Sequence, residues 1–221
     1  MRDDQRGYAA GMGWAALTVI AAATLGKPPS PSASTAEVAS YFVDHQQAVA
    51  VGSTVSAVSA LLFLLFAVSL ADRLSAAWPA AVVRAAGAVT AALAVLGGAL
   101  QAALAQSAAR LDPSAVSAVW TVVWPVFYLT PPLVLSLLLA NAAFGLRATT
   151  VPRWVGVSAG LLAALAFLAG VAGLVTASTT VLGIGFAGLV LTMIWVLATS
   201  IALWRSAAPA ASDKQPALLA H

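Results

Sequence analysis

Four long stretches of this chain contain no charged residue and no histidine. They cover residues 48–71, 85–109, 114–146 and 154–204, which is more than half of the 221 residues. Each helix that crosses a bilayer needs about 20 consecutive apolar residues. Soluble domains carry about 25% charged residues, whereas this chain is 62% hydrophobic and only 8% charged. The sequence therefore predicts a polytopic membrane protein of the all-α class.

Six membrane spans follow from the apolar runs and from the prolines and charges between them. Their approximate ranges are 7–26, 48–70, 80–107, 117–145, 153–175 and 181–204. We expect one six-helix transmembrane domain over 1–206 and a flexible cytoplasmic tail over 207–221. The charged start and first apolar run also fit a cleaved signal peptide. That run is longer than a usual signal core, so the sequence favours a retained helix.

The fourth span contains three prolines, Pro125, Pro131 and Pro132. A proline has no N–H group, and its ring crowds the carbonyl four residues before it. The carbonyls freed in this way need partners from neighbouring helices, hydroxyl groups or trapped water, because hydrocarbon offers none. The sequence therefore predicts a broken helix, and discontinuous helices line the binding sites of many transporters.

Three aromatic residues lie four positions apart on the outer half of this span, so they share one helical face. They fit an aromatic belt at the membrane interface, which is the simpler interpretation. The deepest of them lies about 12 Å below the first, and it fits the wall of a ligand pocket better. For the pocket, the predicted ligand-binding residues are Trp120, Trp124, Tyr128, Pro125, Pro131, Pro132, Gln101 and Gln106.

A short amphipathic helix is predicted just before the second span, on the outer membrane surface. Ser34 or Thr35 caps it, and Glu37 falls in its first turn. Its polar face contains Glu37, Tyr41, Asp44 and His45, and its apolar face contains Val38, Phe42 and Val49. Two carboxylates and one histidine are enough ligands for zinc, but a solvated helix face explains them more simply. We expect no metal, no cofactor and no catalytic residue.

The charge distribution predicts the orientation and excludes several functions. With six spans, eight of the ten basic residues fall on the side of the two termini, and only Lys27 and Arg110 fall on the other. The positive-inside rule then places both termini of a cell-membrane protein in the cytoplasm. Spans without ionisable groups argue against a proton pump or a voltage sensor. No basic face for nucleic acid is present, and a chain without cysteine forms no disulfide.

Several short features together resemble a known type of protein. They are the proline-rich loop KPPSPSAS after the first span, AEVASYFVDH before the second, and PRWVG at the start of the fifth. In this order they resemble bacterial, actinobacterial-type integral membrane proteins with six spans, a family catalogued as a domain of unknown function. The resemblance implies a fold and a membrane location, and it supplies no activity and no catalytic residues.

Three functions remain open at this point. The first is a protein that binds an apolar or amphipathic small molecule or lipid, or facilitates its movement, beside the broken fourth helix. The second is an accessory or scaffold subunit that packs against another membrane protein or a second copy. The third is an outer-face enzyme that uses Glu37, Asp44 and His45. The empty spans favour the first, non-enzymatic function, with membrane lipids as partners and no nucleic acid.

Overall fold

The computed structural model describes residues 3–30, 32–126, 130–149, 151–175 and 179–207. These residues form helices and contain no strand, which confirms the all-α class. The helices are α1 (Asp3–Leu25), α2 (Thr35–Asp44), α3 (Gln46–Ala71), α4 (Ala77–Ser107), α5 (Pro113–Trp124), α6 (Thr130–Gly145), α7 (Arg153–Val175) and α8 (Thr179–Ala207). Two short 3-10 turns, η1 (Ala108–Arg110) and η3 (Leu146–Ala148), follow α4 and α6. The predicted tail lies outside the described residues from position 208 onward.

Five of these helices, α1, α3, α4, α7 and α8, are long and apolar enough to cross a membrane. They lie close to the predicted ranges. An uninterrupted apolar helix satisfies its own backbone hydrogen bonds in a bilayer, so its apolar run is enough to predict it. The two remaining apolar helices, α5 and α6, contain 12 and 16 residues and together occupy the predicted fourth span. Six predicted spans therefore correspond to five long helices and one pair of short ones.

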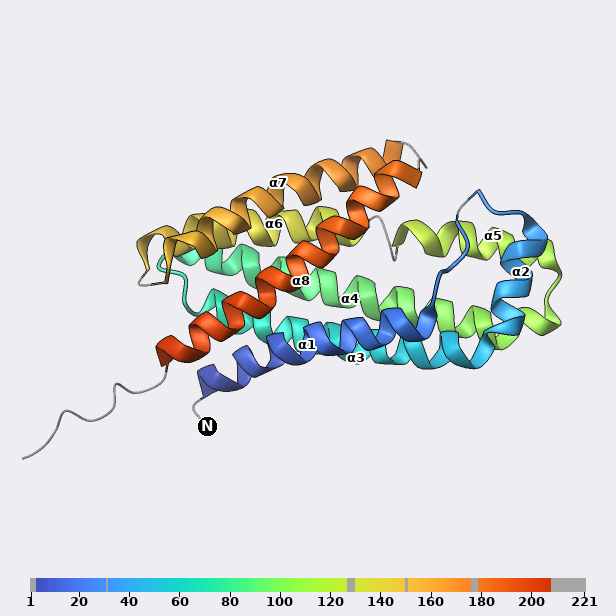
Figure 1. The fold of residues 1–221 in the computed structure, drawn as a ribbon, viewed down its shortest axis with the longest axis horizontal. Helices are drawn as coiled ribbons and strands as arrows, with labels where there is room; N and C mark the ends of the chain where they lie inside the picture. The colour runs from blue at the N-terminus through green and yellow to red at the C-terminus, as the bar shows by residue number, and fades with distance from the viewer. Residues whose placement is uncertain (1–2, 31, 127–129, 150, 176–178, 208–221) are drawn as a thin grey trace, which may run out of the picture.

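The helices α1, α3, α4, α6, α7 and α8 form a closed ring in chain order. Contacts join α1 to α3, α3 to α4, α4 to α6, α6 to α7, α7 to α8, and α8 back to α1. The start of α1 and the end of α8 lie at one end of the bundle, and α2 lies across the opposite end (Figure 1). We call these the terminal end and the cap end.

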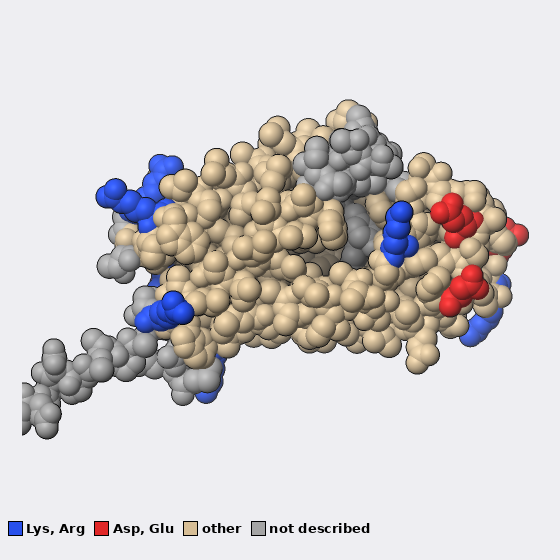
Figure 2. Space-filling view, in the orientation of Figure 1, with Lys and Arg blue, Asp and Glu red and all other residues tan. Residues whose placement is uncertain are grey.

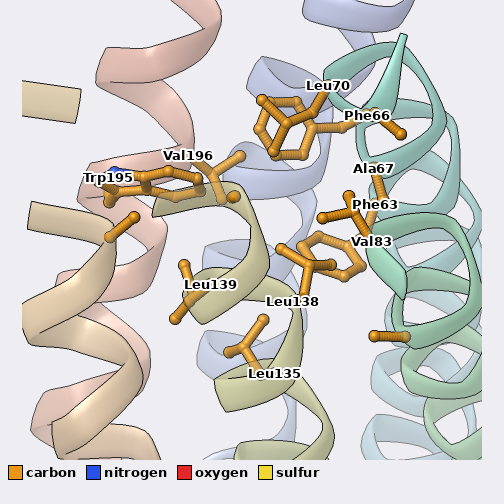
Figure 3. Packing of buried hydrophobic residues seen from close by; sticks show 14 of the residues in the cluster. Phe63, Phe66, Ala67, Leu70, Val83, Leu135, Leu138, Leu139, Trp195 and Val196 are labelled. Atoms are coloured by element: carbon orange, nitrogen blue, oxygen red, sulfur yellow. The ribbon is translucent and has the colours of Figure 1, made fainter. Parts of the chain in front are cut away.

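A large buried cluster, the main cluster, fills the bundle toward its terminal end, and α6 supplies three leucines to it (Figure 3). Its members are Tyr8, Trp14, Ala15, Phe63, Phe66, Ala67, Leu70, Ala71, Ala80, Val83, Ala86, Leu135, Leu138, Leu139, Ala142, Ala143, Leu146, Val155, Ala159, Ala163, Trp195, Val196 and Leu203. The helices approach closely: a Cβ atom added to Gly87 would lie 2.5 Å from the Cβ of Ala67. Small residues permit such contact between membrane helices.

A second buried cluster, the cap cluster, lies at the cap end, where α2 and α5 pack on the ends of α1, α3 and α4. It consists of Leu25, Val38, Tyr41, Phe42, Val49, Leu104, Ala105, Ala108, Val116, Trp120, Val123 and Trp124. This cluster is richer in aromatic side chains and draws on two helices of only 10 and 12 residues.

The predicted break in the fourth span is only partly covered, because residues 127–129 lie outside the described residues. Pro125 follows α5 directly with α-helical dihedral angles, and the described part of α6 begins at Thr130, so Pro131 and Pro132 lie in its first turn. The N–H groups of a helix's first turn have no partner within the helix, so the prolines lose no helical hydrogen bond there. The hydroxyl of Thr130 donates to the Pro125 carbonyl at 2.9 Å. A side-chain hydroxyl therefore serves as a partner for a backbone carbonyl in the proline-containing part of the fourth span, where hydrocarbon would offer none.

Basic side chains are concentrated at the terminal end of the bundle. On the face shown in Figure 2 they gather at that end, whereas the cap end carries acidic side chains together with basic ones. At the terminal end, Arg73 donates from Nε to the Tyr8 hydroxyl at 2.7 Å, and Arg84 pairs with Asp72 at 2.6 Å. The orientation was predicted from the excess of basic residues on the side of the termini.

Candidate functional site

The local sequence explains why α2 forms and where it ends. Ser34 accepts a hydrogen bond from the Glu37 N–H at 3.2 Å, the contact of an N-terminal cap. The helix ends at Asp44, and His45 (φ −113°, ψ 21°) ends α2 and starts α3. The chain bends there, so α2 lies across the bundle (Figure 1). The predicted short helix before the second span is confirmed.

Two of the three predicted aromatic residues lie beneath α2. Trp120 is only 1% exposed and Trp124 8% exposed. The Trp120 ring meets Phe42 edge-on at 5.1 Å and Trp124 at 5.5 Å, measured between ring centroids. Trp120 also donates from Nε1 to the Pro29 carbonyl at 3.2 Å. These two tryptophans therefore form a protein contact rather than a lipid-facing belt, and Tyr128 lies outside the described residues.

Tyr41 differs from its predicted place on the polar face of α2. Its ring is buried with Val38 and Phe42, and its hydroxyl donates to the Leu25 carbonyl at 2.8 Å. Burial raises the pKa of Tyr41 to about 12. A phenol packs on an apolar face when its hydroxyl finds a partner, and the last carbonyls of α1 lack helical partners. Tyr41 thereby attaches α2 to the end of α1.

The rest of the predicted polar cluster faces outward. Glu37, Asp44 and His45 are exposed, and the His45 ring stacks on Tyr41 at 5.1 Å. Within the described ranges, no group of three His, Cys, Asp or Glu side chains is placed to hold a metal ion. Asp44 and His45 line a surface cavity of about 440 Å³ between α1 and the α2–α3 bend.

The predicted polar residues of α4 have opposite environments. Gln106 is exposed, whereas Gln101 is 0% exposed. The Ser53 hydroxyl donates to Gln101 Oε1 at 3.4 Å, and Gln101 Nε2 has no hydrogen-bond partner among the described residues. Exchanging the amide oxygen and nitrogen would still leave one end of the amide without a partner. One end of the buried Gln101 amide is therefore hydrogen-bonded, and the other end has no partner among the described residues.

Sequence reasoning missed Ser53, the partner of Gln101. The backbone of α4 approaches it closely, since a Cβ added to Gly98 would lie 3.1 Å from the Ser53 carbonyl oxygen. A signal was present, because Gly98 and Gln101 lie one turn apart on α4 and Gly52 precedes Ser53 on α3. Small residues beside a polar amide in a membrane helix indicate that a neighbouring helix packs closely there and supplies a hydrogen-bond partner.

No protein-family model matches this chain, and no curated protein or solved structure matches it either. The resemblance to six-span actinobacterial-type proteins therefore stays a prediction. The length and composition of the helices fit an integral membrane protein.

Proposed function

We propose that this chain is an integral membrane protein that binds an apolar or amphipathic small molecule, or a lipid, beside the discontinuous pair α5 and α6. The observation that carries the proposal is the buried amide of Gln101, whose Nε2 has no partner among the described residues. A buried donor without an acceptor costs about 1–3 kcal/mol. Such a group needs an explanation, and a ligand that carries an acceptor oxygen provides one.

The position of Gln101 connects it to the end of α5. It lies one helical turn before Leu104 and Ala105, which pack in the cap cluster together with Trp124. Trp124 is the last residue of α5, and α4 contacts both α5 and α6. Gln101 therefore lies near the level at which α5 ends. A carbonyl or ester oxygen of an otherwise apolar molecule is the acceptor that suits this donor.

The proposal includes six crossings with both termini in the cytoplasm. Helices of 12 and 16 residues extend about 18 and 24 Å, each less than the hydrocarbon thickness of about 30 Å. Placed end to end, α5 and α6 account for one crossing. The gathering of basic side chains at the terminal end supports the cytoplasmic assignment (Figure 2).

Photolabelling with a diazirine-bearing fatty acid methyl ester tests this proposal, since the probe is apolar and carries one ester carbonyl. We expect label on α4, α5 and α6 in membranes that contain the intact protein. Gln101→Leu keeps the volume and removes the donor, so labelling should fall about fivefold, the equivalent of one hydrogen bond of about 1 kcal/mol.

The matched control is Gln106→Leu on the same helix. Gln106 is exposed and is not included in the proposed site, so this variant should label like the wild type. Equal label on every lipid-facing helix of the wild type would contradict the proposal. Unchanged labelling in Gln101→Leu, with the variant folded, would contradict the role of the amide.

One observation favours the second function, association with another membrane helix. The exposed face of α4 carries a row of alanines, Ala81, Ala85, Ala88, Ala92, Ala99 and Ala103. Because the chain has no cysteine, Ala88→Cys would introduce a single thiol on this row. A disulfide-linked dimer in oxidised membranes would support self-association, and Val89→Cys, also exposed, is the neighbouring control.

A further inference from the structure

We propose that the cavity between the end of α1 and the α2–α3 bend binds the primary ammonium headgroup of a membrane lipid such as phosphatidylethanolamine. The cavity has a volume of about 440 Å³ and is lined by Thr24, Asp44, His45, Gln47, Ala48 and Val51. It lies apart from the α5–α6 pair, so this inference stands independently of the proposed function.

The polar part of the lining is rich in acceptors. Asp44 provides an exposed carboxylate, Gln47 an amide oxygen, and Thr24 a hydroxyl that already donates to the Ile20 carbonyl at 2.8 Å. The cavity has no Lys or Arg in its lining. The C-terminal end of α1, which carries partial negative charge, ends beside it. This lining suits a cationic group that donates hydrogen bonds.

His45 adds another acceptor. Its Nδ1 lies 3.1 Å from the Tyr41 carbonyl oxygen, and only a protonated nitrogen forms a hydrogen bond to a carbonyl. In the neutral ring the other nitrogen, Nε2, then has no proton and accepts. The stacking of the ring on Tyr41 holds it in place at the rim of the cavity.

The chemistry of the lining selects a primary ammonium over a quaternary one. A primary ammonium has three N–H donors, which match the carboxylate, the amide oxygen and the imidazole nitrogen. A quaternary ammonium has no N–H donor and is bound by cages of several aromatic rings. Here the single ring in the lining is that of His45.

The apolar part of the lining indicates a lipid rather than a free amine. Ala48 and Val51 lie on the side of the cavity that faces along α3, and Val51 is 48% exposed. Below them both helices present exposed apolar side chains, Val19 and Ile20 on α1 and Val58 on α3. An acyl chain can lie along this surface while the headgroup reaches Asp44, at the end of a helix that lies across the bundle.

The test measures lipid binding to the full-length protein in detergent micelles by native mass spectrometry. Dioleoyl phosphatidylethanolamine and dioleoyl phosphatidylcholine are offered in equal amounts. We expect the wild type to prefer the ethanolamine lipid about fivefold, the size of one exposed ion pair of about 1 kcal/mol. Asp44→Asn should remove this preference. Asp112→Asn should keep it, because Asp112 is an exposed carboxylate at the same end outside the cavity.

Several outcomes would overturn the inference. They are the absence of a preference in the wild type, an undiminished preference in Asp44→Asn, and an equal loss in Asp112→Asn. If Asp44→Asn fails to fold, Gln47→Leu removes a second acceptor and should weaken the preference. Free ethanolamine at millimolar concentration should fail to displace the lipid. If it displaces the lipid, the apolar part of the lining does not contribute to binding.

Discussion

The main cluster and the cap cluster of this protein differ in the helices that form them. The main cluster is formed mainly by long helices packed on one another, as where Gly87 meets Ala67. In the cap cluster, two aromatic side chains donate to carbonyls that lie outside their own helices. Tyr41 reaches Leu25 across 16 residues, and Trp120 reaches Pro29 across 91. The main cluster has a bond of this kind too, from Trp195 of α8 to the Val155 carbonyl of α7, so the two clusters differ chiefly in the length of the helices that form them.

This difference predicts different modes of opening. Each long helix satisfies its own backbone in a bilayer, so the bundle assembles from elements that are stable before they pack. The helix α2 contains only 10 residues, and isolated helices of this length are marginal in water. The helix α5, with 12 residues, is too short to cross the hydrocarbon by itself. The cap should therefore open locally while the bundle stays folded.

The largest effect is expected from Trp195→Ala in the main cluster. Trp195 is buried, meets Phe66 edge-on, and donates from Nε1 to the Val155 carbonyl at 3.0 Å. Its removal should lower the free energy of unfolding by about 4 kcal/mol, and the whole bundle should unfold together. Thermal unfolding in detergent measures this. The control is Trp78→Ala, since Trp78 is 76% exposed, and an equal loss there would contradict the argument.

A smaller and local effect is expected from Trp120→Ala in the cap cluster. The variant loses the ring contacts with Phe42 and Trp124 and the hydrogen bond to Pro29. Large aromatic truncations reduce stability by about 3–5 kcal/mol, and here the reduction should affect the local unfolding of the cap alone. Hydrogen exchange should speed up in α2 and α5 and stay unchanged in α7. Faster exchange throughout the bundle would show that the two clusters are not independent.

The helices could be predicted from the sequence because each depends on local properties. Uninterrupted apolar runs are sufficient for membrane helices, and α7 begins and ends where the predicted fifth span does. The cap helix α2 was predicted from Ser34, its capping residue, and from the apolar spacing that follows.

The partners of the site residues could not be predicted in this way. Tyr41 was assigned to the polar face of α2 because spacing groups it with Asp44, and its burial depends on the Leu25 carbonyl, which local periodicity does not reveal. The burial of Trp120 depends in the same way on α2 and the loop before it. Gln101 was selected as a polar residue in an apolar run, but that pattern does not identify Ser53.

The smallest expected effect concerns Asp112, at the start of α5 in the cap. Its Oδ1 accepts hydrogen bonds from the Ser114 hydroxyl at 2.5 Å and the Ser114 N–H at 2.8 Å, and these lower the pKa of Asp112. A lowered pKa means that the charged form stabilises the fold above the unfolded value of about 3.9. This stabilisation is lost as the pH falls through the lower folded value. The protection factors of the α5 amides, which correct hydrogen exchange for its own pH dependence, should therefore fall below about pH 4. Asp112→Asn keeps an equally good capping residue and should remove this acid response. An unchanged response would mean that another titratable group causes it.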